Sequence, residues 1–243
     1  MIKFIIYVMK LLIAILVSIF FTSCRFNGNF DGIDGSGNVI VQPRTITETF
    51  ENIEVSHGIE LIVEQSSEKS VVVEADDNII SHIITKVENG KLIIESDHSY
   101  NTESNPRVTV KLPIISGLTA TSGSNISSNG KLITEKILVD SESGSQISIE
   151  VEADFISIEA ASGSSAEVSG QALKAETNSS SGSEINARNL SANVVNSVAS
   201  SGSSTSVDPI VKLNAKASSG ASVDYKNTPK ELKKEESSGG SVN

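Results

Sequence analysis

A Ser-Gly dipeptide recurs at nearly constant intervals along the second half of this 243-residue chain, and it limits the possible folds more than any other feature. The glycines of successive copies are 21, 19, 19, 20, 18 and 19 residues apart, and they are Gly123, Gly144, Gly163, Gly182, Gly202, Gly220 and Gly239. The third residue before the first six of them is always alanine or serine, whereas small or β-branched residues stand three positions after. A regular period of this length indicates a stacked repeat.

Each repeat is typical of a strand, a tight glycine corner and another strand. A second corner is indicated about seven residues after the first, at Gly130, Gly170, Asn189 and Asp208-Pro209. A rung of about 19 residues then has room for about three short strands, which predicts an all-β solenoid for residues 116–225. A β-sandwich also has regular short strands, but it does not predict similar side chains at the same place in every unit.

The composition agrees with thin stacked layers and argues against nucleic-acid binding. There is no tryptophan and aromatic residues are 4%, so small and β-branched side chains must fill the core. The formal net charge is −11, and such a surface repels phosphate backbones.

The amino terminus predicts a lipoprotein. Residues 1–23 contain Lys3 and Lys10 and an apolar run, Leu11–Phe21, which is typical of a signal peptide and too short for an ordinary transmembrane helix. The one cysteine, Cys24, follows Phe-Thr-Ser, a sequence that resembles a lipobox although leucine is usual in place of the phenylalanine. We therefore expect lipid on Cys24, followed by a flexible tether over residues 24–44.

Residues 45–115 are expected to be a strand-rich segment with one short helix. Alternating apolar residues on both sides of His57-Gly58 predict two strands with a turn or bulge between them. Isoleucines at helical spacing predict the helix over Ile79–Val87, and Asn89-Gly90 predicts a hairpin after it. Residues 226–243 carry charge where a further rung would close, so they are expected to form a cap.

Several of these stretches together resemble one family. HGIELIVEQ, VVVEADDNIISHIITKVENGKLII and VTVKLPIISGLTATSGS precede the Ser-Gly-Ser rungs, which end in Val223-Asp224-Tyr225 with Pro229. This combination, over residues 48–230, resembles the auto-transporter adhesin head GIN domain, a domain of unknown function common in Bacteroidetes lipoproteins. The resemblance implies a right-handed parallel β-helix outside the cytoplasm, and it implies no established activity.

No residue pattern indicates a cofactor, a resident metal or a catalytic nucleophile. The histidines, His57, His82 and His98, have no metal-ligand spacing in the sequence. Ser-Gly-Ser is not a nucleophile elbow, which needs glycines on both sides of one serine. Glu150, Glu152 and Asp154 are expected to form an outward acidic row, and whether this row binds Ca²⁺ is left open.

Two hypotheses remain from the sequence. The first is a non-enzymatic, adhesin-like binding or scaffold module, held in the outer membrane by lipid on Cys24 and facing the periplasm or the cell surface. Its partner would be a glycan or a cell-surface protein. The second is a polysaccharide lyase or hydrolase that uses outward carboxylates. The sequence does not set the oligomeric state.

Overall fold

The computed structural model describes residues 9–10 and 32–243 of the chain. Contacts divide the chain into two units, Met1–Asp31 and Gly32–Asn243, and all the repeats belong to the second. Among the described residues, no helix combines the length and the apolar character needed to cross a bilayer. Cys24 and all but two residues of the expected signal peptide lie outside the described residues, so both stay predictions.

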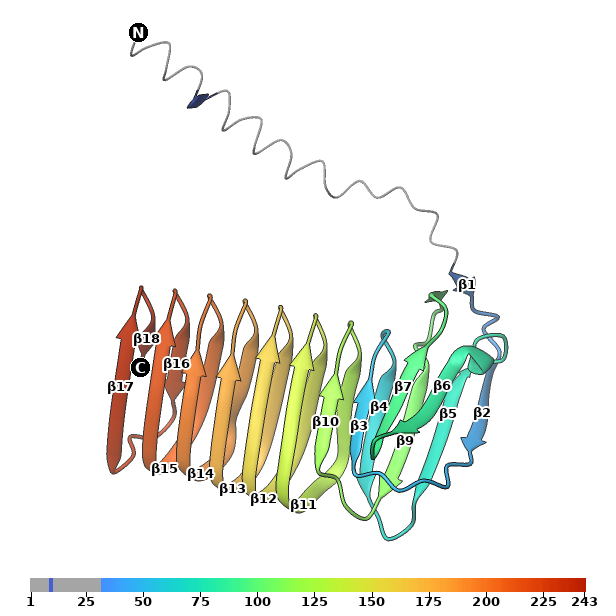
Figure 1. The fold of residues 1–243 in the computed structure, drawn as a ribbon, viewed down its shortest axis with the longest axis horizontal. Helices are drawn as coiled ribbons and strands as arrows, with labels where there is room; N and C mark the ends of the chain where they lie inside the picture. The colour runs from blue at the N-terminus through green and yellow to red at the C-terminus, as the bar shows by residue number, and fades with distance from the viewer. Residues whose placement is uncertain (1–8, 11–31) are drawn as a thin grey trace. The chain divides into compact units, whose positions relative to one another are not determined.

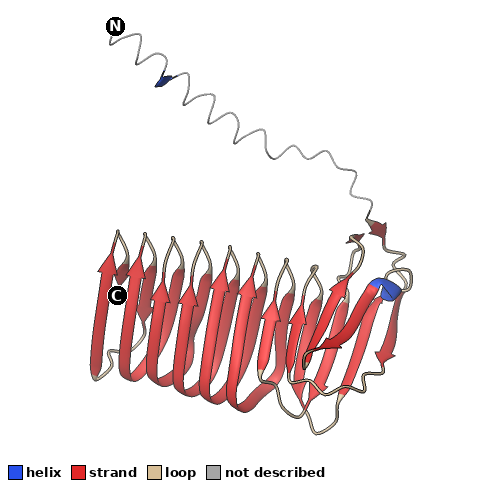
Figure 2. Cartoon of the chain, in the orientation of Figure 1, coloured by secondary structure: helices blue, strands red, loops and turns tan. Residues whose placement is uncertain are grey.

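The Ser-Gly repeats form the stacked rungs of an all-β solenoid, as their period predicts (Figures 1 and 2). From Asn125 to Ser218 the chain between two Ser-Gly corners is a single long strand that pairs in parallel with the strands of the neighbouring rungs. Alternate side chains point inward, and they are mainly isoleucine, valine, leucine and alanine. The strands are β10 (Gly117–Ala120), β11 (Asn125–Glu142), β12 (Gln146–Ala161), β13 (Ser165–Ser179), β14 (Glu184–Ala199), β15 (Ser204–Ser218) and β16 (Ser222–Tyr225).

Each Ser-Gly corner is a turn in which both residues have left-handed backbone conformations. At Ser143-Gly144 the φ angles are 54° and 72°, and the other copies have similar values. Two successive positive φ angles are those of a type I′ turn, which favours glycine. The glycine N–H donates to a serine carbonyl of the next rung, as from Gly144 to Ser162 at 3.2 Å. The predicted corner residues are confirmed as stacked turns, and they are Gly123, Gly144, Gly163, Gly182, Gly202 and Gly220.

The serine after the glycine explains why the motif reads Ser-Gly-Ser. In each full copy this serine is buried, and its hydroxyl donates to a backbone carbonyl of the preceding rung. Ser145 Oγ donates to Ala120 O at 2.7 Å, and Ser183 Oγ donates to Ala160 O at 2.7 Å. The motif therefore supplies the turn and a link between rungs at the same time.

The second corner lies further along each rung than the sequence indicated. Near Gly130 in β11 and Asn189 in β14 the parallel ladder shifts register, which marks a β-bulge within a strand, whereas Gly170 pairs in register with Val151 and Leu190. The chain bends instead at Asp154-Phe155 and the equivalent positions, where two successive side chains point outward and the ladder skips a residue. The expectation of three short strands in a rung is therefore wrong, because pairing resumes directly after the bend and each of β11 to β15 is one strand.

Four strands extend the solenoid beyond the first Ser-Gly corner: β3 (Asn52–Val55), β4 (Glu60–Gln65), β7 (Lys91–Ser96) and β9 (Arg107–Leu112). His57-Gly58, between β3 and β4, has φ angles of 62° and 70°, so it is one more corner of the same kind. The rungs do not follow chain order here, because β3 lies between β7 and β10, and β4 lies between β9 and β11.

Antiparallel strands close this end of the solenoid. β5 (Ser70–Asp76) pairs with β9, and β6 (Ile83–Glu88) pairs with β7 across the predicted Asn89-Gly90 hairpin, which is confirmed. The short helix expected over Ile79–Val87 is present only as the 3-10 helix η1 (Ile80–His82), and Ile83–Val87 belong to strand β6 instead. Pairing with β7 overrides the local helical spacing, since Val87 lies opposite Leu92 in the hairpin.

The expected tether is shorter than residues 24–44. β2 (Val39–Arg44) pairs antiparallel with β5, and β1 (Ile33–Asp34) pairs with β8 (Tyr100–Asn101), so residues from 33 onward belong to the folded unit.

The expected cap, residues 226–243, forms a further rung. β17 (Glu231–Ser237) pairs in parallel with β15, and β18 (Ser241–Val242) pairs with β16. Lys212 and Lys216 of β15 form ion pairs with Glu231 and Glu235 at 3.1 and 2.8 Å, so charge on this segment supports pairing. All side chains of β17 are exposed, and charged residues on an outermost strand discourage pairing with another chain.

Candidate functional site

The outward side chains that follow the Ser-Gly corners form a regular surface, called here the polar face. Two in-register rows cross the rungs on this face, and their positions alternate with buried ones. The first row is Asn125, Gln146, Ser165, Glu184, Ser204 and Ser222, and the second row is Ser127, Ser148, Glu167, Asn186, Ser206 and Asp224. Both rows consist of hydroxyl, amide and carboxylate groups, with no lysine or arginine in either.

The predicted acidic row continues the polar face toward the second corner. Glu150, Glu152 and Asp154 are exposed, as expected from their alternation with buried residues. Lys131 of the preceding rung lies 3.9 Å from Glu150 and 3.2 Å from Glu152, so it offsets part of their charge. Their carboxylates do not converge as the ligands of a metal ion do, so the geometry adds nothing in favour of a Ca²⁺ site.

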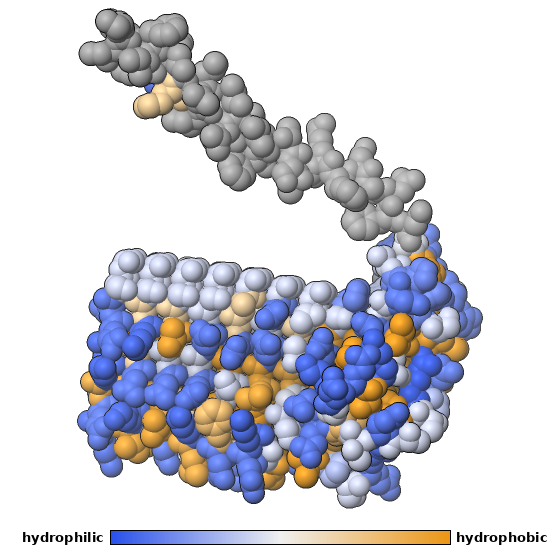
Figure 3. Space-filling view, viewed as in Figure 1, coloured by the Kyte–Doolittle hydropathy of each residue, from blue (hydrophilic) through white to orange (hydrophobic). Residues whose placement is uncertain are grey.

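A groove of about 710 Å³ lies beside Glu152 and Asp154, at the end of this row that is nearest the bend. It combines the carboxylates of Glu152 and Asp154 with the exposed aliphatic side chains of Ile133, Leu173 and Ile210. Figure 3 shows the contrast between the two edges of the solenoid, because the Ser-Gly corners form a pale ridge and hydrophobic residues emerge away from it.

The opposite face, whose outward side chains precede the corners, contains Asp140, the one carboxyl group with a raised pKa among those described whose pKa is shifted. Burial, followed by the charges of Glu142 and Glu159, raises the pKa of Asp140 to about 6, although Lys91 acts in the other direction. Asp140 lines a shallow groove of about 230 Å³ with Lys91 and Glu159. Sequence reasoning missed it, since the neighbours come from three different strands.

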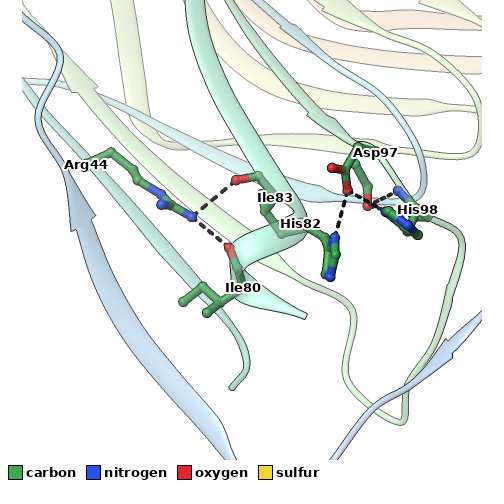
Figure 4. Close-up of polar contacts among 7 residues, drawn as sticks. Arg44, Ile80, His82, Ile83, Asp97 and His98 are labelled. Carbon is green, nitrogen blue, oxygen red and sulfur yellow. Dashed lines mark hydrogen bonds and ion pairs between the residues drawn. The ribbon is translucent and has the colours of Figure 1, made fainter. Parts of the chain in front are cut away.

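A second group that sequence reasoning missed lies where the antiparallel strands close the solenoid (Figure 4). His82, at the end of η1, and His98, after β7, both point their Nδ1 atoms at Asp97 Oδ1, at 2.9 and 2.8 Å. The imidazole rings are 4.4 Å apart between centroids and inclined at 61°. Hydrogen bonds from His98 and His82 lower the pKa of Asp97, so its carboxylate stays ionised.

The backbone around these three residues is tied on both sides. Arg44 Nη2 donates to Ile80 O at 2.7 Å and to Ile83 O at 3.1 Å, which holds η1 against β2 (Figure 4). Asp97 N–H donates to His82 O at 3.2 Å. Ser96 Oγ donates to His98 O at 2.7 Å, so the loop that follows β7 is fixed as well.

Within the part of the chain that the structure describes, His82, Asp97 and His98 are the one group of three or more histidine, cysteine or acidic residues whose ligand atoms all lie within 4.8 Å. The hairpin could have revealed it from the sequence. His82 and Asp97 are each seven residues from the Asn89-Gly90 turn, so antiparallel pairing brings them together. The helix expected over Ile79–Val87 concealed this relation.

Comparison with solved structures supports the fold. A putative adhesin from Bacteroides fragilis NCTC 9343 matches with a TM-score of 0.80 and 18% identity over 87% of this chain and 99% of that one. A putative lipid binding protein from Parabacteroides distasonis ATCC 8503 matches with a TM-score of 0.69 and 20% identity over 88% and 99%. A putative adhesin from Parabacteroides merdae ATCC 43184 matches with a TM-score of 0.68 and 17% identity over 87% and 98%. No curated protein matches the chain significantly.

The chain therefore shares the β-solenoid fold of these structures. The family model described as "Putative auto-transporter adhesin, head GIN domain" matches residues 49–229, and the chain belongs to this family. The resemblance inferred from the sequence is confirmed.

Proposed function

We propose that the chain is a non-enzymatic, adhesin-like module of the cell envelope that binds a glycan through the polar face. Lipid on Cys24 would hold it in the outer membrane, with the solenoid in the periplasm or at the cell surface. The observation that carries the proposal is the pair of in-register rows of hydroxyl, amide and carboxylate side chains. The family description and the adhesins among the similar structures support the same class of function.

The physics of the polar face suits a polymer with many hydroxyl groups. Equivalent side chains repeat about every 4.8 Å along the stack, which is the spacing of hydrogen-bonded strands. Because the ladders fix the backbone before any ligand arrives, binding orders few additional groups. The rows lack large apolar anchors of the kind that dominate protein–protein interfaces, so a glycan fits them better than a protein.

A binding test needs a matched pair of variants. Glu167→Lys with Asn186→Lys changes neighbouring rungs on the polar face, whereas Glu159→Lys with Asn178→Lys changes the same residue types in neighbouring rungs on the opposite face. On a glycan array, the purified chain with Cys24→Ser should bind, the first variant should lose binding, and the second should retain it. Equal binding by both variants, or none by the parent, would refute the role of the polar face.

A lipid is the competing ligand, because one similar structure is described as a lipid-binding protein. Flotation of the same Cys24→Ser chain with zwitterionic phospholipid vesicles distinguishes the two ligands. The proposal expects no flotation, whereas flotation without glycan binding would contradict it.

The enzymatic alternative is favoured by one observation, the raised pKa of Asp140, since a carboxyl group that keeps its proton near neutral pH suits a general acid. Incubation with polysaccharides and measurement of new reducing or unsaturated ends decides this point. We expect no turnover. Turnover that disappears in Asp140→Asn would establish an enzyme and overturn the proposal.

The anchoring is tested separately. Metabolic labelling with a palmitate analogue should mark the native chain and not Cys24→Ala. Protease treatment of intact cells then separates a surface position, in which the solenoid is cut, from a periplasmic one, in which it is protected.

A further inference from the structure

We propose that His82, Asp97 and His98 form a binding site for one transition-metal dication, with Zn²⁺ as its natural probe. The site is independent of the glycan-binding proposal, because it lies at the closed end of the solenoid and uses none of the residues of the polar face.

The ligand types suit such an ion. Two imidazole nitrogens and one carboxylate oxygen are a common set for zinc, with the remaining position open to water or another ligand. Asp97 Oδ1 lies between the Nδ1 atoms of His82 and His98, so one carboxylate oxygen and two imidazole nitrogens converge on one point. When the ion binds, each ring carries its proton on Nε2, because a nitrogen that donates an N–H to Asp97 has no lone pair for the metal.

The distances require little rearrangement. Ligand atoms around a tetrahedral zinc ion lie about 3.3 to 3.6 Å apart, given bonds of about 2.0 to 2.2 Å. Asp97 Oδ1 is 2.8 and 2.9 Å from the two histidine nitrogens, and the three ligand atoms span no more than 4.8 Å. The His82 and His98 side chains are 29% and 53% exposed, so both rings have room to withdraw by about half an ångström and admit the ion.

The backbone supports the site on two sides. The clamp of Arg44 on η1 fixes the segment that ends at His82, and the bond from Asp97 N–H to His82 O joins that segment to the loop after β7. Tyr100, two residues after His98, donates a hydrogen bond from its hydroxyl to His57 O, which joins the loop after β7 to the His57-Gly58 corner. A preorganised pair of segments loses less conformational freedom on binding an ion than two independent loops would.

The test uses the full chain with Cys24→Ser, which removes the thiol as a competing ligand, purified without a histidine tag. Isothermal titration with Zn²⁺ should give one site per chain. His82→Gln, His98→Gln and Asp97→Asn should each weaken binding by at least about tenfold, because a change even in an outer-shell residue typically costs about 10–100-fold. His57→Gln changes an exposed histidine outside the site and should leave affinity and stoichiometry unaltered.

A second measurement protects against misfolded variants. Co²⁺ in place of Zn²⁺ should give visible absorption bands in the parent chain and in His57→Gln, and these should be absent in His82→Gln, while circular dichroism melts show all three folded. Absence of stoichiometric Zn²⁺ binding by the parent chain would overturn the proposal, as would equal binding by all variants. In either case His82, Asp97 and His98 are a hydrogen-bonded trio and nothing more.

Discussion

The repeat half and the amino-terminal end of the solenoid are stabilised in different ways. From β10 to β16, each rung makes nearly the same contacts as the next, so the Ser-Gly corner, the buried serine and the inward aliphatic residues recur. From β2 to β9, antiparallel strands and rungs out of chain order create contacts that are not repeated elsewhere, such as those of Arg44, His82 and Asp97.

This difference separates distributed stability from unique contacts. In a stacked repeat the stability is close to a sum of similar nearest-neighbour terms, so no single corner should dominate. At the closed end the single side chain of Arg44 joins β2 to η1, and no repeated contact can compensate for its removal. The following predictions test that contrast, and they run from the largest expected effect to the smallest.

Gly170 is the expected exception to equivalence among the rungs. It has a φ of 115°, and a Cβ at this position would lie 2.0 Å from Val151 O, whereas nothing lies within 4 Å of a Cβ at Gly144. Gly170→Ala should therefore lower the free energy of unfolding by about 3–5 kcal/mol, from backbone strain and overpacking together.

Gly144→Ala is the control, since it adds left-handed strain alone, which costs about 1–2 kcal/mol. Urea denaturation followed by circular dichroism measures both variants. Equal destabilisation would mean that the backbone at Gly170 relaxes freely, and it would contradict the contact with Val151.

Arg44 tests the importance of a unique contact. Arg44→Leu removes a charged donor from Ile80 O and Ile83 O, and hydrogen bonds to charged groups contribute about 1.5–3 kcal/mol. We expect a loss of about 2–3 kcal/mol and faster hydrogen exchange confined to β2, η1 and β6.

Arg107→Leu is the matched control for Arg44→Leu. Its ion pair with Glu60, at 3.1 Å, is 45% exposed on the arginine side, so its loss should cost no more than about 1 kcal/mol. If hydrogen exchange in Arg44→Leu rises throughout the rungs, the closed end is not an independent region.

Ser183 represents the repeated contacts. Ser183→Ala removes the hydrogen bond to Ala160 O and should cost about 0.5–1.5 kcal/mol, because that carbonyl also accepts a bond from Ser180 N–H. Ser148→Ala, at an exposed position in β12, should be within about 0.5 kcal/mol of the parent. A loss in Ser183→Ala as large as that expected for Arg44→Leu would contradict distributed stability.

Asp140 should show the smallest effect, and one that depends on pH. Its pKa rises from 3.8 to about 6 on folding, so the ionised carboxylate destabilises the fold. Below about pH 4 Asp140 is protonated in both the folded and the unfolded state, so folding carries no penalty. The penalty develops between about pH 4 and 6 and is complete above about pH 6.

Asp140→Asn removes this penalty, so its melting temperature should exceed that of the parent at pH 7.5 and equal it at pH 4. A change of about 1 kcal/mol in the free energy of unfolding shifts the melting temperature by about 2–4 °C in a domain of this size. Because Asp140 is partly exposed, the increase in melting temperature at pH 7.5 should be smaller than about 2–4 °C. An advantage that is equal at both pH values would indicate a change in packing and not in charge.

The repeat half was largely predictable, and the closed end was not. The Ser-Gly period predicted the corners and the alternation predicted the inward residues, because every rung gives the same local information. The second corner at Asp154-Phe155 was missed, since this bend contains neither glycine nor proline. The tail β17 was interpreted as a cap because its side chains are charged, although strand pairing there depends on the backbone.

The sequence by itself determined an all-β stacked repeat with glycine corners and an outward row at Glu150, Glu152 and Asp154. These features depend on residues close together in the chain, whose alternation and spacing carry the information. Tertiary structure alone decided the meeting of His82 with His98 and the environment of Asp140. Both depend on which strands pair, and for β6 that pairing overrode a local pattern that favoured a helix.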